Sequence, residues 1–204
     1  MNEYLKPLAP KLPQTVYYYL DEVYKEFDIT SGNRRNFFLT HALIESAYFS
    51  KMEECLFYTT AARIAAVWPS RFNMTGTGGK LNANEFVRNP QKLANVVYAG
   101  RMGNKDVNDG WTYRGRSIFG LTGKDAYAAY SLFSGVDCVS DPDILTRDLR
   151  EAFRCGGWFF AEYKKLLPFC DDGNFAATVL RVNGSMQTLP ERTNILQEVI
   201  KCRP

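Results

Sequence analysis

The segment FFLTHALIESAYFS, residues 37–50, is the most informative for the fold, because it predicts a helix with a mainly apolar face that also carries a carboxylate. Four of its residues stand at positions i, i+4, i+7 and i+11 and so share one helical face: Phe38, Ala42, Glu45 and Phe49. The neighbouring stripe is also apolar or aromatic. We therefore predict a central, largely buried helix over residues 34–49. Glu45 on it is either a general acid or a buried carboxylate paired with an arginine.

A second acidic position, the pair Glu53 and Glu54, follows soon after. On one continuous helix, nine residues would carry Glu54 to the side opposite Glu45 and roughly 13 Å along the axis. The helical pattern is poor over residues 50–55, so a break there is expected to return the second acid across a cleft. A gap of roughly 6.5 to 9.5 Å between two carboxylates suits an inverting glycosidase. The alternative is that both acids are ordinary surface charges.

The composition sets wider limits. A chain of 204 residues with 46% hydrophobic and 14% aromatic residues is large enough to bury a core as one domain or two joined lobes. Its net charge is +3, with Lys and Arg scattered along the sequence. That pattern excludes a dedicated nucleic-acid binder and predicts only a mild attraction to an anionic polymer.

The N-terminal 20 residues lack the basic-then-apolar order of a secretory signal, which predicts synthesis in the cytoplasm. No apolar run approaches the roughly 20 residues needed to span a bilayer, so no membrane insertion is expected. Five widely spaced cysteines without a C-x-x-C pair argue against a disulfide framework and a zinc site, and we expect reduced, mostly buried thiols. The single histidine, His41, excludes a multi-histidine metal centre. Packing or hydrogen bonding is the favoured role for it over a nucleophilic triad.

The remaining pattern is mostly helical. Helices are predicted over residues 15–27, 58–67, 90–101, 123–133, 141–163 with a kink at the Gly156–Gly157 pair, 174–184 and 189–201. Residues 68–90 are rich in Gly and Asn and read as a loop-rich segment, and residues 102–123 as an irregular or short-strand segment. The predicted class is mainly α with a small irregular or β element.

Several of these segments together resemble glycoside hydrolase family 19, the chitinase-like fold. They are FFLTHALIES, the acid nine residues after Glu45, NPQKLANVVYAGRMGN, DGWTYRGRSIFGLTG and RVNG, in the family's order and spacing. The resemblance covers nearly the whole chain and is closest to short endolysins of bacteriophages that infect Gram-negative hosts. It implies a lysozyme-like, two-lobed helical fold with a central cleft, forming one catalytic domain over residues 1–204 without a separate cell-wall-binding module.

The resemblance also implies roles for individual residues. Glu45 matches the general acid, Glu54 matches the general base better than Glu53, and Thr122 matches a residue that holds the attacking water. Six further residues match substrate-binding positions or lie in the matched motifs, where lining the cleft and bracing it are both open: Tyr58, Tyr98, Asn104, Arg116, Asn183 and Arg192. For Arg101 and Arg116, bracing by pairing with buried acids is favoured over substrate contact.

The chain departs from the family pattern at several positions. Ile44 stands where the family has a His, and His41 where it has a Gln. In GRSIFGLT, Ser117 replaces a Gly and Gly120 replaces a Gln of the substrate site. These departures keep a catalytically weakened glycan-binding protein open as an alternative.

The function expected from the residues and the resemblance is an inverting, muramidase-type endolysin that cleaves β-1,4 bonds between peptidoglycan amino sugars, without metal or cofactor. Chitinase, secreted antibacterial effector and lytic transglycosylase remain alternatives. The expected partners are peptidoglycan glycan strands, with a holin for release or an immunity protein, and no nucleic acid. We expect a monomer that is made in the host cytoplasm and acts in the periplasm.

Overall fold

The computed structural model describes residues 7–8 and 12–202. The predicted mainly helical class is confirmed, because helices dominate and the strands are two residues long. The chain divides into two compact units. Unit 1 comprises Met1–Glu53, Arg116–Leu121 and Asp143–Pro204; unit 2 comprises Glu54–Gly115 and Thr122–Pro142. Of the N-terminal stretch used to predict cytoplasmic synthesis, residues 1–6 and 9–11 lie outside the described residues.

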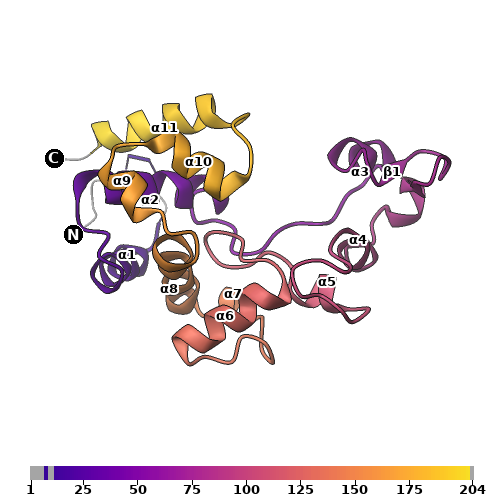
Figure 1. The fold of residues 1–204 in the computed structure, drawn as a ribbon, viewed down its shortest axis with the longest axis horizontal. Helices are drawn as coiled ribbons and strands as arrows, with labels where there is room; N and C mark the ends of the chain where they lie inside the picture. Colours follow the sequence, from indigo (N-terminus) through magenta and orange to yellow (C-terminus); the bar gives the residue numbers. More distant parts are fainter. Residues whose placement is uncertain (1–6, 9–11, 203–204) are drawn as a thin grey trace. The chain divides into compact units, whose positions relative to one another are not determined.

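Unit 1 is built around one buried helix (Figure 1). Its elements are α1 (Gln14–Glu26), α2 (Gly32–Glu45), α7 (Ile144–Arg147), α8 (Leu149–Trp158), the π-helical turn η3 (Phe159–Tyr163), α9 (Leu167–Asp171), α10 (Phe175–Asn183) and α11 (Leu189–Lys201). Helix α2 packs against α9, α10 and α11, while α1 packs against α8. Phe38 on α2 is fully buried and contacts the rings of Tyr24, Phe119 and Phe160. This aromatic core fixes α2, and with it Glu45.

Unit 2 holds the loop-rich segment. Its elements are α3 (Ala61–Val67), β1 (Phe72–Asn73), β2 (Leu81–Asn82), the 3-10 turn η2 (Ala83–Phe86), α4 (Pro90–Val97), α5 (Asp109–Thr112) and α6 (Lys124–Ser134). The two strands pair in parallel, and the core beneath them includes Ile64, Phe72 and Leu93. Asn89 caps α4 by accepting a hydrogen bond from Lys92 N–H, as the Asn-Pro sequence predicts.

At least three predicted helix boundaries are wrong. Helix α4 ends at Val97 rather than at residue 101. Helix α2 ends at Glu45 rather than Phe49, and α3 begins at Ala61 rather than Tyr58. In α3 the reason is the N-cap: the Thr60 hydroxyl accepts from Arg63 N–H, and the Thr60 backbone is extended. The helix predicted over residues 141–163 is interrupted at Asp148, between α7 and α8, and this break was not predicted. The Gly156–Gly157 pair, where the kink was predicted, lies inside α8, shortly before the π-turn that begins at Phe159.

The cysteine prediction is confirmed in part. Cys138, Cys155 and Cys170 are buried, whereas Cys55 is exposed and Cys202 is intermediate, and all five are thiols. In the part of the chain that the structure describes, no helix is both long and apolar enough to cross a bilayer. Residues 7–8 and 12–202 also contain no group of three or more His, Cys, Asp or Glu side chains placed to hold a metal ion.

Candidate active site

Glu45 is the last residue of α2, and an unusual turn follows it. Tyr48 N–H donates to Leu43 C=O at 2.6 Å and Ala47 N–H donates to Ile44 C=O at 3.3 Å, which together form a Schellman motif. Ala47, Tyr48 and Phe49 all have positive φ, between 48° and 60°. Glycine usually occupies the first of these positions because L side chains are strained there. The helix therefore stops sharply at the carboxylate.

Ser46 helps to end the helix. Its hydroxyl donates to Ala42 C=O at 2.6 Å and accepts from Phe49 N–H at 2.9 Å. Such side-chain bonds compete with helical ones. Phe49 then turns inward against Phe153, with ring centroids 5.1 Å apart. As a result, the Glu45 side chain is 26% exposed rather than enclosed in an apolar stripe, which corrects the expectation of burial.

The Glu45 carboxylate pairs with Arg192 from α11. Arg192 Nη2 donates to Glu45 Oε1 at 2.5 Å, and the Arg192 side chain is only 4% exposed. The sequence had left open whether Glu45 pairs with an arginine, and it does. Within the described residues, the second oxygen, Oε2, has no hydrogen-bond partner.

Arg192 is itself held from two further sides. Its Nη1 lies 2.9 Å from His41 Nδ1, and its Nε donates to Thr188 Oγ1 at 3.1 Å. The same hydroxyl oxygen accepts from Asn183 Nδ2 at 2.9 Å. The structure thus brings Glu45, Arg192 and Asn183 into one hydrogen-bonded group, all within unit 1. The substrate contacts expected of Arg192 and Asn183 stay predictions.

Glu54 lies at the start of unit 2, where two donors orient its carboxylate. Gly115 N–H donates to Oε1 at 2.6 Å and Tyr98 Oη–H donates to Oε2 at 2.8 Å. The backbone also pairs, since Glu54 N–H donates to Gly115 C=O at 2.9 Å. Burial first, and then the Glu54 charge, raise the pKa of Tyr98, so Tyr98 remains a donor. Glu54 is therefore a fixed group rather than a mobile surface charge.

Thr122 and Tyr58 flank this carboxylate. A methyl group placed on Gly115 would lie 3.2 Å from Thr122 Oγ1 and 3.4 Å from Glu54 Cδ, so the three residues are in close contact. Burial raises the pKa of the Tyr58 phenol, and the Glu54 charge adds to the rise. The Tyr58 ring packs edge-on against Trp68 with centroids 5.5 Å apart. Glu53, by contrast, pairs through its backbone with Arg116.

Two of the predicted residues have bracing contacts. Asn104 is 2% exposed, donates to Tyr98 C=O at 3.1 Å and accepts from Lys124 N–H at 3.0 Å. Arg116 is 1% exposed and donates to Asp143 at 2.5 Å. These contacts brace the surrounding chain, and the substrate contacts expected of Asn104 and Arg116 stay predictions. The Asp143 side chain is 62% exposed, so the acid that pairs with Arg116 is not buried.

The positions that depart from the family pattern can also be placed. Arg116 and Leu121 exchange two backbone hydrogen bonds and close a short loop, in which Ser117 has φ 70° and Gly120 φ 64°. Ser117 therefore occupies a conformation that favours glycine. Gly120 is exposed, with nothing within 4 Å of where its Cβ would be. Ile44 is partly buried.

Some contributors to the site were missed from the sequence. Three of them form hydrogen bonds that the hydrophobic periodicity of the sequence does not indicate: Gly115, Thr188 and Thr178. Gly115 had a weak signal, as a glycine between two arginines in a motif without helix formers. The prediction that His41 has a packing or hydrogen-bonding role is confirmed, since it is fully buried and bonded at both ring nitrogens.

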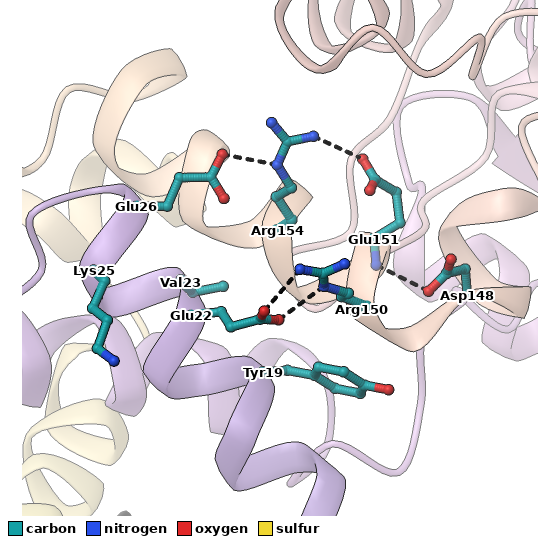
Figure 2. A pocket seen from close by; sticks show the side chains of 9 residues that line it. All are labelled: Tyr19, Glu22, Val23, Lys25, Glu26, Asp148, Arg150, Glu151 and Arg154. Atoms are coloured by element: carbon teal, nitrogen blue, oxygen red, sulfur yellow. Dashed lines mark hydrogen bonds and ion pairs between the residues drawn. The ribbon is translucent and has the colours of Figure 1, made fainter.

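A surface pocket lies apart from these carboxylates. It has a volume of about 450 Å³, is lined by α1 and α8, and contains neither Glu45 nor Glu54 (Figure 2). Two ion pairs join side chains that line it: Arg150 with Glu22 at 2.7 Å, and Arg154 with Glu26 at 2.8 Å. These ion pairs link the two helices.

Proteins described as family 19 glycosyl hydrolases or endochitinases are similar to this chain in sequence. A glycosyl hydrolase family 19 domain-containing protein of Haemophilus influenzae is 30% identical over 122 residues, which cover 59% of this chain and 58% of that protein. Two endochitinases of Arabidopsis thaliana are 36% and 35% identical over 75 residues, covering 37% of this chain and 26% and 25% of theirs. No protein-family model matches the chain.

The fold is similar to that of solved chitinases. A bacterial family 19 chitinase superposes with a TM-score of 0.64 at 15% identity, over 99% of this chain and 93% of that one. The chain resembles glycoside hydrolase family 19 in both sequence and fold. The family 19 resemblance predicted from the motifs is thereby confirmed. Chitinase C of Streptomyces griseus gives a TM-score of 0.63 at 14% identity, over 99% of this chain and 75% of that one. The chain spans less than two thirds of the length of the curated family 19 and endochitinase relatives.

Proposed function

We propose that the chain is a glycoside hydrolase that cleaves β-1,4 bonds between the amino sugars of peptidoglycan by an inverting acid/base mechanism. One observation carries the proposal: two carboxylates in a family 19-like chain are each oriented by partners yet remain accessible. Glu45 is fixed by the buried Arg192, and Glu54 is fixed by Gly115 and Tyr98. Two positioned carboxyl groups are the minimum that inverting hydrolysis needs.

Glu45 is proposed as the general acid. Arg192 engages Oε1 and so orients the carboxyl group, which leaves Oε2 facing no partner among the described residues. In the reaction, Glu45 transfers a proton to the glycosidic oxygen as the bond from that oxygen to the anomeric carbon breaks. The released sugar leaves with a hydroxyl group in place of the bridging oxygen.

Glu54 is proposed as the general base. Its two carboxylate oxygens offer about four acceptor positions, and Gly115 and Tyr98 use one each. The remainder can accept from a water molecule, with Thr122 Oγ1 nearby to hold it. The water oxygen bonds to the anomeric carbon from the face opposite the leaving group, and its proton passes to Glu54. The configuration at the anomeric carbon is therefore inverted, and exchange with solvent returns Glu54 and Glu45 to their starting protonation states.

The substrate class is argued from charge and from the motifs. The chain carries a net charge of +3, and peptidoglycan presents carboxylates on its peptides whereas chitin is neutral. The motif resemblance to phage endolysins favours the same polymer. Chitin is the second candidate, because the similar solved structures are of chitinases and two curated relatives are named endochitinases.

The test compares wild type with Glu45→Gln, Glu54→Gln and Glu53→Gln on peptidoglycan and on chitin oligosaccharides. Glu53 is the matched control, because it is the adjacent glutamate and its carboxyl group is assigned no catalytic part. Glu45→Gln and Glu54→Gln are expected to lower kcat by about 10² to 10⁴, and Glu53→Gln to leave it near wild type. Equal activity in all four proteins would rule out the acid/base assignment.

Product analysis separates the remaining alternatives. Mass spectrometry of digested peptidoglycan identifies the bond, and NMR of the first products shows the anomeric configuration. Anhydro-sugar products together with tolerance of Glu54→Gln would indicate a lytic transglycosylase. Binding to glycan without any product would indicate a glycan-binding protein. Retained configuration would contradict inversion.

We also propose where the protein acts. A peptidoglycan hydrolase of this kind would act in the periplasm, released by a holin during phage lysis or delivered as an antibacterial effector with a matching immunity protein. Lysis of outer-membrane-permeabilised cells by the wild-type protein, but not by Glu45→Gln, is the expected result. Intact cells in both cases would contradict the bacteriolytic role.

A further inference from the structure

The hydrogen-bonded group that holds Glu45 continues beyond Arg192 to the buried residue His41. His41 lies on α2 four residues before Glu45 and is fully buried. Its ring stacks on Phe175, with centroids 5.2 Å apart and planes at 26°. His41 Nδ1 faces Arg192 and His41 Nε2 faces Thr178, each at 2.9 Å. A buried histidine with a partner on each nitrogen is fixed in both position and orientation.

Only one arrangement of protons satisfies these contacts. A guanidinium group has donors and no acceptor, so His41 Nδ1 must accept from Arg192. The neutral ring then carries its proton on Nε2 and donates it to Thr178 Oγ1. The Thr178 hydroxyl in turn donates to Phe175 C=O at 2.6 Å. Burial, with Arg192 adding to it, lowers the pKa of His41 to about 3, so the ring is neutral near pH 7.

Arg192 depends on this acceptor. Its guanidinium is buried and reaches three partners with three different nitrogens: Glu45 through Nη2, His41 through Nη1 and Thr188 through Nε. Loss of the His41 acceptor would leave a buried N–H unsatisfied, which is costly. The planar group would then rotate to find another acceptor, and Glu45 would move with it.

We propose that His41 is a positioning residue, which as a neutral hydrogen-bond acceptor holds the Arg192 guanidinium and through it sets the orientation of Glu45. The inference rests on the proposed role of Glu45 as the general acid. It also gives a reason for the histidine at this position, where the family pattern has a glutamine.

The first test uses three variants of the whole chain. His41→Leu removes the acceptor and keeps an apolar side chain of moderate size, His41→Asn retains an oxygen acceptor near the Nδ1 position, and Thr178→Val removes the group that receives Nε2–H. We expect His41→Leu to lower kcat by about tenfold to a hundredfold with KM changed less than about twofold. In His41→Asn, kcat should recover most of this loss. The kcat of Thr178→Val should lie between those of His41→Leu and His41→Asn.

A purely structural role would give a different pattern. His41→Leu and His41→Asn would then lower Tm and the activity per total protein in parallel, and kcat per folded molecule would stay at the wild-type value. That result, or wild-type kcat in His41→Leu, would overturn the proposal.

The second test does not depend on activity. Because His41 is the only histidine in the sequence, untagged protein labelled with ¹⁵N-histidine gives one imidazole spin system. We expect a proton on Nε2, a bare Nδ1 that accepts a hydrogen bond, and no titration of the ring near pH 6.5. A proton on Nδ1, or titration near pH 6.5, would overturn the proposal. A wild-type protein inactive on both polymers but with the expected NMR signals would instead refute the proposed function and leave the Arg192–His41 geometry standing.

Discussion

Substituting Gly115 with alanine tests the Glu54 site without removing any of its chemical groups. The added methyl would lie 3.2 Å from Thr122 Oγ1 and 3.4 Å from Glu54 Cδ, closer than ordinary contact for the first and at its edge for the second. The Thr122 side chain must therefore move by a few tenths of an ångström. Overpacking of this degree costs about 1 kcal/mol, which lowers Tm by about 2–4 °C in a chain of this size.

The expected effect on activity is larger than the effect on stability. A displacement of about 1 Å costs roughly a hundredfold in rate, so a shift of a few tenths of an ångström should lower kcat by about tenfold. The measurements are kcat on the polymer that wild type cleaves, and Tm by circular dichroism. Gly110→Ala is the contrasting variant: its methyl would meet the backbone of α4, 2.5 Å from Ala94 O and 2.8 Å from Asn95 Cα, and should cost far more stability. Wild-type kcat in Gly115→Ala would refute the close grouping of Gly115, Thr122 and Glu54.

Two further predictions concern the helix that carries Glu45. Ala47→Gly should relieve the backbone strain of a left-handed residue with φ 48° and raise Tm by about 2–4 °C. The control is Ala62→Gly on the exposed face of α3, which should lower Tm by a similar amount. A lower Tm in both variants would contradict the strained turn. Stability should also decrease with acid. The unfolded chain protonates His41 near pH 6.5 and the folded chain only near pH 3, so unfolding takes up one proton between these values. The free energy of unfolding should fall by about 2 kcal/mol between pH 7 and pH 5. Denaturant titrations of His41→Asn should show that this fall is absent.

The sequence predicted the helix of Glu45 correctly but extended it too far. The spacing of Phe38, Ala42, Glu45 and Phe49 placed all four on one face, and Phe49 is indeed buried. It reaches the core, however, from a turn of left-handed residues rather than from another helical turn. Periodicity records which residues are buried and not the path of the backbone between them. With neither Gly nor Pro after Glu45, the turn had no sequence signal beyond the capacity of Ser46 to bond back to the helix.

The choice between Glu53 and Glu54 shows a different limit. The two are chemically identical neighbours, and periodicity gives no reason to prefer either; the family resemblance favoured Glu54. The structure shows how Glu54 is held, because its carboxylate accepts hydrogen bonds from Gly115 N–H and Tyr98 Oη–H. Those partners lie 61 and 44 residues away in sequence, so no local pattern could have indicated them. Donors that are distant in sequence therefore fix the Glu54 carboxylate, and only the fold brings them to it.

The two proposed acid/base residues are held by different chemistry, and this difference fits their separate tasks. Glu54 is held by neutral donors, a backbone N–H and a phenol, which orient a carboxylate without adding charge beside the water that it activates. Glu45 is held by a cation that is itself confined by His41 and Thr188. A general acid must present its proton along one direction, and a guanidinium fixed at three nitrogens holds Glu45 Oε1 in place more tightly than a mobile ammonium group would. Because a neutral His41 accepts from that guanidinium, the restraint adds no second positive charge beside Glu45.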